Sequence, residues 1–444
     1  MTAAPTVNYD PHTCDVVVIG GGPGGSTAAT LLAERGCRVV LFEKAKHPRF
    51  HIGESLLPLN LPLFEQLGVA DEVRRIGMPK YGVEFVAPTR QDPVTIEFAE
   101  AWDKSHPFSY QVHRAAFDDI LFRNAVRKGA LAFEECRVTR VEFNSGGAVV
   151  STRLADSSTQ SWQCKFVIDA SGRDTVLANH FGIKQRSLKH CSAAIFGHFS
   201  GATRLPGKAE GHISIFWFRH GWFWFIPLSD GATSVGAVCW PQYLRTRKVP
   251  PEQFLRDTIA LCPALVERLR TATLISPVTA TGNYSYQSAR ASEQHYLMVG
   301  DAFQFIDPVF STGVFIAMQN AFDAADTVMV CLDKPRRTTA ALKAYDKAIR
   351  RGPAIFSWYI HRVTTPGLRG LLMASSNVFR LREALLSVLA GDIFRGTAHG
   401  TRLLAFKALY YITSLLSPMQ NFTAWQQRRR AIRESGISAA PAGE

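Results

Sequence analysis

The chain has 444 residues, of which 46% are hydrophobic and 20% charged, and this balance excludes a disordered, collagen-like or coiled-coil protein. Its length predicts more than one domain, and its 50 Lys and Arg against 37 Asp and Glu give a formal net charge of +13. The most apolar late stretch, 403–419, includes Lys407 and is shorter than the roughly twenty apolar residues of a membrane span, so no membrane span is predicted.

The N-terminus and the cysteines indicate where the protein works. The first residues are polar and lack the basic and then apolar pattern of a signal peptide. The 8 cysteines are scattered, with no CxxC pair and no histidines at ligand spacing, so neither a metal site nor a disulfide framework is predicted. We therefore expect a reduced, cytoplasmic protein without a bound metal.

The N-terminal segment has the pattern of a dinucleotide-binding βαβ unit. The predicted order is a strand (15–19), a glycine-rich turn (20–25), a helix (26–35) and a second strand (38–42). Gly20 allows the tight turn, Gly22 lets a pyrophosphate approach the backbone, and Gly25 permits close packing of helix on strand. Glu43 follows the second strand, where a carboxylate can accept hydrogen bonds from both hydroxyls of a ribose.

Two later segments indicate which dinucleotide binds. Residues 162–172 predict a strand that runs into a turn of small residues, and residues 296–302 predict a strand that ends in Gly-Asp. Both resemble the second and third fingerprints of flavoprotein hydroxylases. The resemblance implies FAD, with Asp301 on its ribityl chain and Arg114, from the segment His-Arg-Ala-Ala-Phe-Asp, lying along it. A helix N-cap is the alternative reading of Asp301.

Only one glycine-rich fold is present, so a second domain for NAD(P)H is not expected. A flavin that cannot be reduced by its own protein needs a separate flavin reductase as a partner.

Residues 221–227 carry the first of three signals that resemble flavin-dependent halogenases. The segment Gly-Trp-Phe-Trp-Phe-Ile-Pro contains the WxWxIP string of that family, with Trp222 and Trp224 in register. The resemblance implies that these tryptophans keep the substrate away from the flavin. An alternating aromatic run also suits the buried face of a β-strand, so packing in the core is the alternative.

The second signal is the pattern Phe-x-x-Pro-x-x-Ser-x-Gly, which residues 305–313 fit. The resemblance places Thr312 and Gly313 near the flavin as a halide site, and amides at the start of a helix expected over 314–330 would hold chloride or bromide. A purely structural turn into that helix is the alternative. Tryptophan halogenases have a Glu where this chain has Phe310, which implies a ring that is already electron-rich and groups Phe310 with the substrate-shielding residues.

The third signal is Lys80, in the segment Met-Pro-Lys-Tyr-Gly-Val-Glu-Phe (78–85) that follows the loop Gly-Glu-Ser (53–55). Halogenases have an essential lysine in this context, so the resemblance implies that Lys80 is catalytic. Its ammonium would hydrogen-bond hypohalous acid, or its free amine would form a haloamine. A solvated surface lysine is the alternative.

Over residues 1–330 the chain resembles flavin-dependent halogenases of the phenol and pyrrole type, within the FAD-dependent monooxygenases. The resemblance implies that FADH2 and O2 form a flavin C4a-hydroperoxide, which oxidises halide to hypohalous acid. The acid passes to Lys80 and halogenates, in the first instance chlorinates, a phenolic or pyrrolic ring. A flavin monooxygenase or reductase on the same scaffold is one alternative, and an FAD-containing interaction or sensor protein is another.

The expected architecture is α/β. A Rossmann-type FAD-binding domain would comprise 1–80, 110–180 and 290–332, a β-sheet substrate domain 81–109 and 181–289, and a helical C-terminal region 333–444. Strands of the substrate domain are expected over 192–200, 212–218, 222–227 and 233–240. Breaks between the C-terminal helices are expected at Pro353, Pro366-Gly367 and Gly391, and residues 437–444 are expected to fray.

Basic residues are concentrated in the last quarter of the chain. Residues 333–444 contain 18 Lys and Arg against 6 Asp and Glu. This excess suggests an acidic partner, such as an acyl carrier protein that presents the aromatic ring on a phosphopantetheine arm, although a solvated helix surface or contact with anionic lipid would also explain it. No nucleic-acid-binding motif accompanies the basic residues, so nucleic acid is not expected as a partner.

Overall fold

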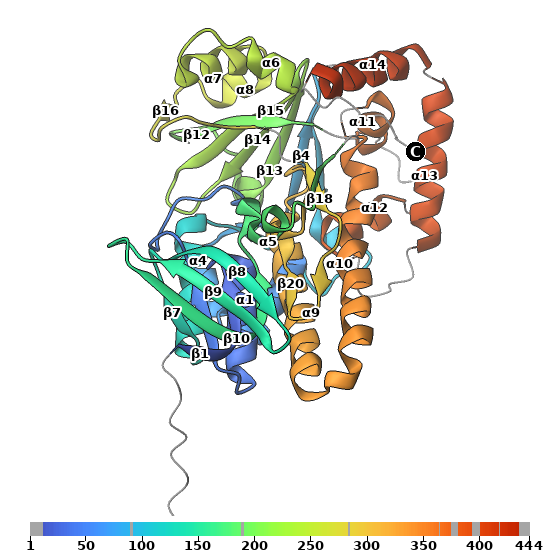
Figure 1. Cartoon of the computed structure of the whole chain (residues 1–444). Coiled ribbons are helices and arrows are strands. Elements are labelled where there is room, and N and C mark those ends of the chain that lie inside the picture. The colour runs from blue at the N-terminus through green and yellow to red at the C-terminus, as the bar shows by residue number, and fades with distance from the viewer. Residues whose placement is uncertain are drawn as a thin grey trace, which may run out of the picture.

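The computed structural model describes residues 12–88, 92–187, 191–282, 285–363, 365–373, 381–392, 400–416 and 418–434. Two large β-sheets lie one above the other in Figure 1, and long C-terminal helices run along one side of both. The expected α/β class is confirmed. Residues 437–444, which were expected to fray, lie outside the described residues.

The lower sheet has the order β19-β20-β10-β1-β2-β7, in which the strands from β20 to β7 are parallel and β19 is antiparallel to β20. Its strands are β1 (Thr13–Ile19), β2 (Val39–Phe42), β7 (Leu131–Phe133), β8 (Arg137–Asn144), β9 (Gly147–Arg153), β10 (Thr159–Asp169), β19 (Ser292–Glu293) and β20 (Tyr296–Met298). β1 pairs in parallel with β2 and with β10, so the strands predicted from the first glycine motif are confirmed. Val16, Val17 and Val18 have no exposed surface, as expected of a parallel strand covered on both faces.

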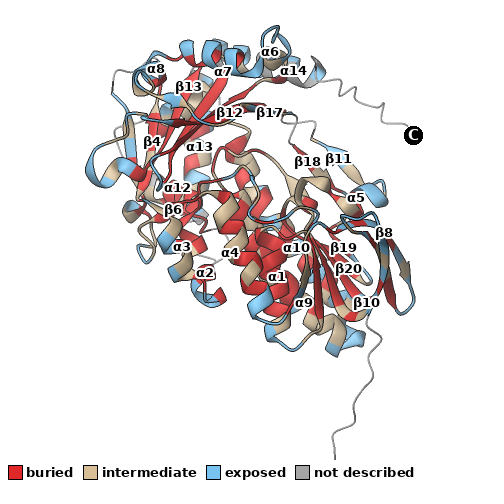
Figure 2. Ribbon diagram, turned by 90° about the vertical axis from the view of Figure 1, so that its left-hand side faces the viewer, coloured by how far each residue is buried: buried red, intermediate tan, exposed pale blue. Residues whose placement is uncertain are grey.

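Helices α1 (Pro23–Glu34), α4 (Arg114–Arg127) and α9 (Gly313–Asp333) pack with this sheet into one buried core. Figure 2 shows buried residues along α1 and the adjoining strands, as well as across the upper sheet. Helix α1 begins three residues earlier than predicted because Gly22 is its N-cap and Pro23 suits the first helical position. The turn therefore delivers the helix N-terminus directly to the end of β1.

The upper sheet is mostly antiparallel, in the order β16-β12-β15-β14-β13-β4-β5, with β17 paired to β12. Its strands are β4 (Gly82–Val86), β5 (Val94–Glu97), β12 (Ala193–Ser200), β13 (Ile213–Phe218), β14 (Gly221–Pro227), β15 (Thr233–Cys239), β16 (Thr273–Leu274) and β17 (Thr279–Thr281). The four strands predicted over 192–240 are confirmed to within one residue at each end. Every residue of β13, β14 and β15 is buried, which agrees with their apolar and aromatic composition.

Two small sheets join the large ones. β3 (Met78–Lys80) pairs with β6 (Ser109–Gln111), and β18 (Tyr286–Ser288) lies between β11 (Lys184–Arg186) and β21 (Gln304–Phe305). The remaining short elements up to α9 are η1 (Pro58–Asn60), α2 (Leu61–Leu67), α3 (Ala70–Ile76), η2 (Phe98–Glu100), η3 (Gly172–Asp174), α5 (Val176–His180), η4 (Gly207–Gly211), α6 (Pro241–Arg245), α7 (Pro251–Ala260), α8 (Pro263–Arg268) and η5 (Gly300–Ala302).

The C-terminal helices cover one flank of both sheets. They are α10 (Thr338–Ile360), which follows η6 (Pro335–Arg337), α11 (Pro366–Leu372), α12 (Leu381–Leu389), α13 (Gly400–Leu416) and α14 (Pro418–Glu434). The break predicted at Pro353 is wrong, because α10 continues through this buried proline, whose carbonyl accepts a hydrogen bond from Ser357 Oγ at 2.5 Å. Burial of Phe356 and Tyr359 offsets the backbone hydrogen bond that a proline removes.

The other two predicted breaks are confirmed. Pro366 begins α11, and Gly391, with a φ of +99°, follows the end of α12. Among the residues described, no helix is both long and apolar enough to cross a membrane.

Candidate active site

The glycine-rich turn between β1 and α1 is shaped for a close approach to backbone. Gly20 has a φ of +101°, and a Cβ on Gly25 would lie 1.9 Å from the carbonyl oxygen of Gly20. A Cβ on Gly22 would meet no protein atom closer than Arg49 Nη2 at 3.7 Å, so the space in front of the helix is open. First-turn amides and the helix dipole make this space suitable for a pyrophosphate.

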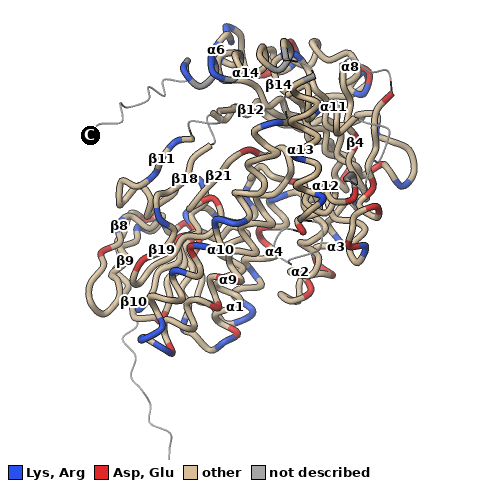
Figure 3. Tube along the Cα trace, turned by 90° about the vertical axis from the view of Figure 1, so that its right-hand side faces the viewer, with Lys and Arg blue, Asp and Glu red and all other residues tan. Residues whose placement is uncertain are grey.

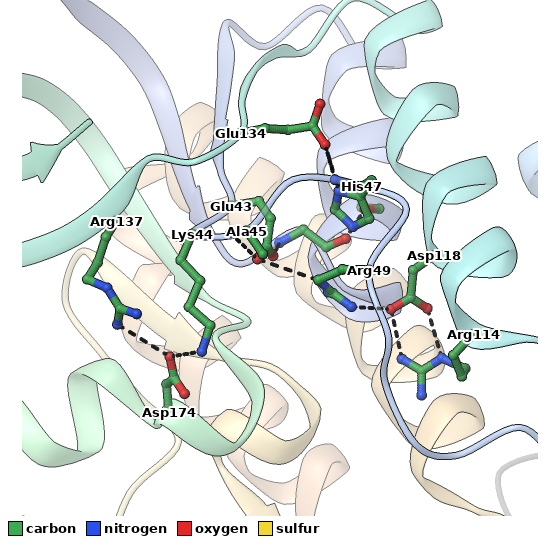
Figure 4. A network of polar contacts seen from close by, with 12 residues as sticks. Glu43, Lys44, Ala45, His47, Arg49, Arg114, Asp118, Glu134, Arg137 and Asp174 are labelled. Atoms are coloured by element: carbon green, nitrogen blue, oxygen red, sulfur yellow. Dashed lines mark hydrogen bonds and ion pairs between the residues drawn. The ribbon is translucent and has the colours of Figure 1, made fainter. Parts of the chain in front are cut away.

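Glu43 stands at the end of β2, beside that turn. Its Oε2 accepts a hydrogen bond from the Gly21 amide at 2.7 Å, and its Oε1 accepts one from the Ala45 amide at 2.9 Å. Arg49 Nε lies 3.6 Å from Oε1 and balances the charge of this buried carboxylate. Figure 4 shows Arg49 between Glu43 and Asp118. The carboxylate is thus fixed where a ribose bound at the turn would meet it.

Arg114, the first residue of α4, continues the same network. Its Nε and Nη2 donate to the two carboxylate oxygens of Asp118 at 2.8 and 3.0 Å, and its Nη1 donates to the Ile52 carbonyl at 2.9 Å. Burial would raise the pKa of Asp118, but Arg114 and Arg49 outweigh burial and lower it. Arg114 and Glu43 therefore lie at the two ends of one ion-paired chain that runs from the glycine turn to the 50–55 loop.

Asp301 lies in η5, directly after β20. It does not cap α9, because the N-cap of α9 is Thr312, eleven residues later. Burial raises the pKa of Asp301 to about 6, against the lowering effect of the charges on Arg173 and Arg114. Within the described part of the chain, its carboxylate has no hydrogen-bond partner, and so it can accept hydrogen bonds from a polyol chain.

Thr312 and Gly313 form the start of α9. Thr312 is the N-cap, its side chain makes no capping hydrogen bond, and a Cβ on Gly313 would have no atom within 4 Å. Ser311 has a φ of +56°, which is uncommon for a residue with a side chain and turns the backbone sharply into the helix. First-turn amides that face open space are suitable donors for a halide ion.

Lys80 ends β3 and is only 1% exposed, so the alternative of a surface lysine is wrong. Its Nζ donates to Ser55 Oγ at 3.0 Å and to the Leu56 carbonyl at 2.5 Å, and it lies 5.2 Å from the ring centre of Phe98. Burial lowers the pKa of Lys80 to about 7. In the described structure no carboxylate pairs with it, so the side chain is shared between amine and ammonium near neutral pH.

A cavity of about 20 Å³ adjoins Lys80, which is room for one molecule about the size of water. Phe310 and Ser311 line it together with Lys80, and its other walls come from β4, β13, η2 and α12 and from Leu57 and Val309. Because Ser311 immediately precedes Thr312, one backbone step separates the lysine cavity from the start of α9. The structure therefore brings Lys80 and Phe310 together, next to the predicted halide residues.

Trp222 and Trp224 lie on β14 in the same apolar core cluster as Phe310. Their rings are 6.2 Å apart, and Trp224 Nε1 donates to Ser234 Oγ at 3.1 Å. A Cβ on Gly236 would come within 2.2 Å of the Trp224 ring, so this indole fits against β15 only because residue 236 is a glycine. Neither tryptophan lines the Lys80 cavity, which leaves their shielding role a prediction.

The sequence did not predict a cluster formed by the buried Glu54 and His198 with the half-buried His113. Glu54 is 1% exposed, and its Oε1 lies 2.8 Å from His198 Nε2 and 3.9 Å from His113 Nδ1. Its Oε2 has no hydrogen-bond partner among the described residues. Burial lowers the pKa of His198, but Glu54 and Asp230 outweigh burial and raise it. The segment Gly-Glu-Ser was the only local signal, since the two histidines come from distant elements.

Comparisons with known proteins agree with this geometry. Residues 13–353 match the family model described as an FAD binding domain. A 1H-pyrrole-2-carbonyl-[peptidyl-carrier protein] chlorinase from Pseudomonas fluorescens is 29% identical over 87% of this chain and 90% of its own length. A flavin-dependent halogenase from Armillaria mellea is 31% identical over 72% of this chain and 68% of its own length.

A solved structure is similar over most of the molecule. The myxobacterial chondrochloren halogenase, described as a new variant of FAD-dependent halogenases, has a TM-score of 0.76 and 33% identity. The match covers 87% of this chain and 92% of that one. The open space at Gly22, the anchored Glu43 and the Asp301 carboxylate, which has no partner among the described residues, fit the FAD of the matched family model.

Proposed function

The chain belongs to the flavin-dependent halogenases, and we propose that it halogenates an electron-rich phenolic or pyrrolic ring at Lys80, with the ring carried by an acyl carrier protein. The enzyme is an FAD-dependent oxidoreductase that uses halide to halogenate aromatic substrates. One observation carries the assignment of Lys80: this lysine is buried, has no carboxylate partner in the described structure, and shares a cavity with the residues that lead into α9.

The residues proposed to hold the cofactor lie around the carboxyl ends of the parallel strands. Bound FAD, reduced by a separate flavin reductase, would supply the activation of dioxygen that oxidises the halide. The chain's own residues bind and orient the reactants. The proposed cofactor ligands are Gly20, Gly22, Gly25, Glu43, Arg114 and Asp301. Thr312 and Gly313 would hold chloride with the first-turn amides of α9.

Lys80 is proposed to receive hypohalous acid and to present it to the ring. The ammonium form would donate a hydrogen bond to the oxidant, and the amine form would react with it to give a haloamine and water. A pKa of about 7 gives both forms substantial populations near neutral pH. Phe98 and Phe310 make the surroundings of Lys80 apolar, which limits hydrolysis and diffusion of the oxidant.

Phe310 supports an electron-rich substrate. It lines the Lys80 cavity, so a Glu at this position would face the lysine, whereas the phenyl ring gives no charge that could stabilise a cationic ring intermediate. A phenol or pyrrole stabilises that positive charge with its own oxygen or nitrogen lone pair. The pyrrole carbonyl on a peptidyl carrier that the Pseudomonas relative chlorinates has this character.

The C-terminal helices offer a surface for the proposed carrier. Exposed apolar side chains gather on two consecutive helices, which we call the α13–α14 face: Leu404, Tyr411, Ile412, Leu415, Met419, Phe422 and Trp425. The exposed Arg429 stacks on Trp425 at 4.3 Å, and Arg433 is also exposed. Figure 3 turns this flank toward the viewer. An apolar patch within a strongly basic region suits an acidic protein partner.

Three further expectations stay proposals. The division into an FAD-binding domain (1–80, 110–180 and 290–332), a substrate domain (81–109 and 181–289) and a C-terminal region (333–444) would separate flavin chemistry from ring chemistry. Trp222 and Trp224 are proposed to shield the substrate from the flavin. The proposed location is the cytoplasm, where the 8 cysteines, all of them free thiols in the structure, would stay reduced.

Turnover with two forms of substrate tests the proposed function. The full-length enzyme, loaded with FAD, would be mixed with a flavin reductase, NADH, chloride and either a pyrrole or phenol thioester on a carrier protein or the free ring. Intact-protein mass spectrometry should show one or more additions of chlorine to the carrier-bound ring. Hydroxylated product without chlorine would instead identify a flavin monooxygenase. Chlorination of the free ring alone would exclude a carrier-bound substrate.

A further inference from the structure

A second cavity, of about 370 Å³, opens at the end of the β13–β14 hairpin. It lies between the upper sheet and two C-terminal helices, and its walls include Trp217 on β13, Trp240 after β15, Pro366 and Arg369 on α11, and Thr423 on α14. No residue lines both this cavity and the one at Lys80. Its volume is that of a small-molecule site.

Arg369 gives this cavity its chemical character. Its guanidinium is half-buried and lies 5.7 Å from the ring centre of Trp217, and its buried Nε has no hydrogen-bond acceptor in the part of the chain that the structure describes. Among the residues described, no carboxylate pairs with it, and burial lowers its pKa. An unpaired buried charge is costly, and a guanidinium offers two parallel N–H donors that match a carboxylate or a phosphate. The exposed Arg219 adds a second positive charge to the cavity wall.

The two cavities are neighbours along β13. Ile213 and Ile215 line the Lys80 cavity, and Trp217, two residues further on, lines the Arg369 cavity. Alternate residues of a strand face the same side, so these three side chains form one row about 13 Å long. Phe85, from the Lys80 cavity, stacks on Trp217 at 5.4 Å. A stacked pair of aromatic rings therefore stands between the two sites.

The mouth of the Arg369 cavity also adjoins the α13–α14 face. Thr423 and Ala424 line the cavity, and the exposed Phe422 and Trp425 flank them on α14. A protein docked on that face would thus bring any group it carries close to Arg369.

We propose that the Arg369 cavity binds the phosphate of a carrier's phosphopantetheine arm. This inference rests on the proposed function, because it assumes that the substrate ring is carried by an acyl carrier protein. Trp217 and Trp240 supply apolar walls for the organic part of the ligand, and Arg369 supplies the charge that selects an anion.

Binding can be measured without turnover, by calorimetric titration of the FAD-loaded full-length enzyme. The probes are phosphopantetheine, pantetheine without the phosphate, and pyrrole-2-carboxylate. Phosphopantetheine should bind and pantetheine should not, whereas binding of pyrrole-2-carboxylate alone would overturn the assignment to a phosphate. Arg369→Met, which keeps most of the side-chain volume, should lower the affinity for the anion by about tenfold to a hundredfold.

Arg362→Met is the matched control. Arg362 is also half-buried and stacks on a tryptophan, but it donates to the Trp358 carbonyl at 2.9 Å and does not line the cavity, so its replacement should leave anion binding unchanged. Arg369→Lys keeps a positive charge but loses the paired donors, so it should bind the anion several-fold more weakly than the wild type. This variant also tests the role of Arg369 if the Met variant does not fold.

Equal anion affinity in wild type, Arg369→Met and Arg369→Lys would overturn the inference, as would equal affinity for pantetheine and phosphopantetheine. Because these measurements involve no chemistry at Lys80, they can fail while halogenation stands, and loss of halogenation on replacing Lys80 says nothing about Arg369.

Discussion

Replacing Lys80 with Met should abolish halogenation and at the same time stabilise the fold below neutral pH. Burial lowers the pKa of Lys80 from its ordinary value of 10.5 to about 7, which corresponds to an upper limit of about 4–5 kcal/mol for keeping this ammonium buried. Methionine removes that cost but leaves Ser55 Oγ and the Leu56 carbonyl without their donor, a loss of about 1–3 kcal/mol. The expected net gain is therefore about 1–4 kcal/mol at pH 6.

The pH dependence of that gain follows from proton counting. Between pH 7 and 10.5 the unfolded wild-type chain retains a proton that the folded chain has lost, so the stability of the wild type rises with pH. The advantage of Lys80→Met should be largest below pH 7 and should shrink steadily up to pH 10.5. Urea unfolding at pH 6, 8 and 9.5 measures this, with Lys208→Met, at an exposed lysine, as the matched control.

Activity assays complete the test of Lys80. Lys80→Met should still consume reduced flavin and oxygen at close to the wild-type rate, because the residues proposed to hold FAD lie outside the Lys80 cavity. Halogenated product should fall below detection, and Lys208→Met should retain it. Undiminished product from Lys80→Met would refute the catalytic assignment, and a stability gain that does not depend on pH would refute the buried-ammonium argument.

Three further outcomes are expected. Gly22→Leu should fold with nearly unchanged stability, since a Cβ there meets no atom closer than Arg49 Nη2 at 3.7 Å, but the purified variant should lack the flavin absorbance of the wild type. Retained flavin would contradict the proposed pyrophosphate site. The rate of halogenation by the wild type should change near pH 7, because that is the pKa of Lys80. The rate should rise with pH if the amine reacts and fall if the ammonium donates a hydrogen bond. A rate that stays constant between pH 6 and 8 would exclude both roles of Lys80. Raising the salt concentration from 0.1 to 1 M shortens the Debye length from about 10 to about 3 Å, so it should slow turnover of the carrier-bound ring far more than turnover of the free ring. Binding of the protein to anionic vesicles but not to the carrier would instead indicate that the basic region contacts a membrane surface.

The parts of the fold that the sequence predicted are those fixed by local chemistry. The run of valines in β1, the glycine turn and the proline at the start of α1 each specify their conformation within a few residues. The strands of the upper sheet were predicted because period-two patterns and bulky aromatic residues persist over each of them. Pro353 shows the limit of such local rules, since tertiary burial holds α10 together where the residue alone favours a break.

The site depends on contacts that no local pattern reveals. Lys80 is a core residue only because β3 pairs with β6 and the chain near Ser55 folds back over it. Glu54 meets His198 across 144 positions, and neither residue type at either place suggests the pair. Arg369 was one of 18 basic residues in the last quarter, and only its burial without a carboxylate partner among the described residues distinguishes it.

Phe310 is proposed to link the pKa of Lys80 to the choice of substrate. A carboxylate at position 310 would lie in the Lys80 cavity, where it would pair with the ammonium and raise the pKa of the lysine. With phenylalanine there, burial alone sets the pKa of the lysine at about 7. The residues described at the cavity then include no anion that could stabilise a cationic ring. We therefore propose that phenylalanine at position 310 has two effects: it leaves a lysine that can react as an amine, and it favours a ring that stabilises its own positive charge.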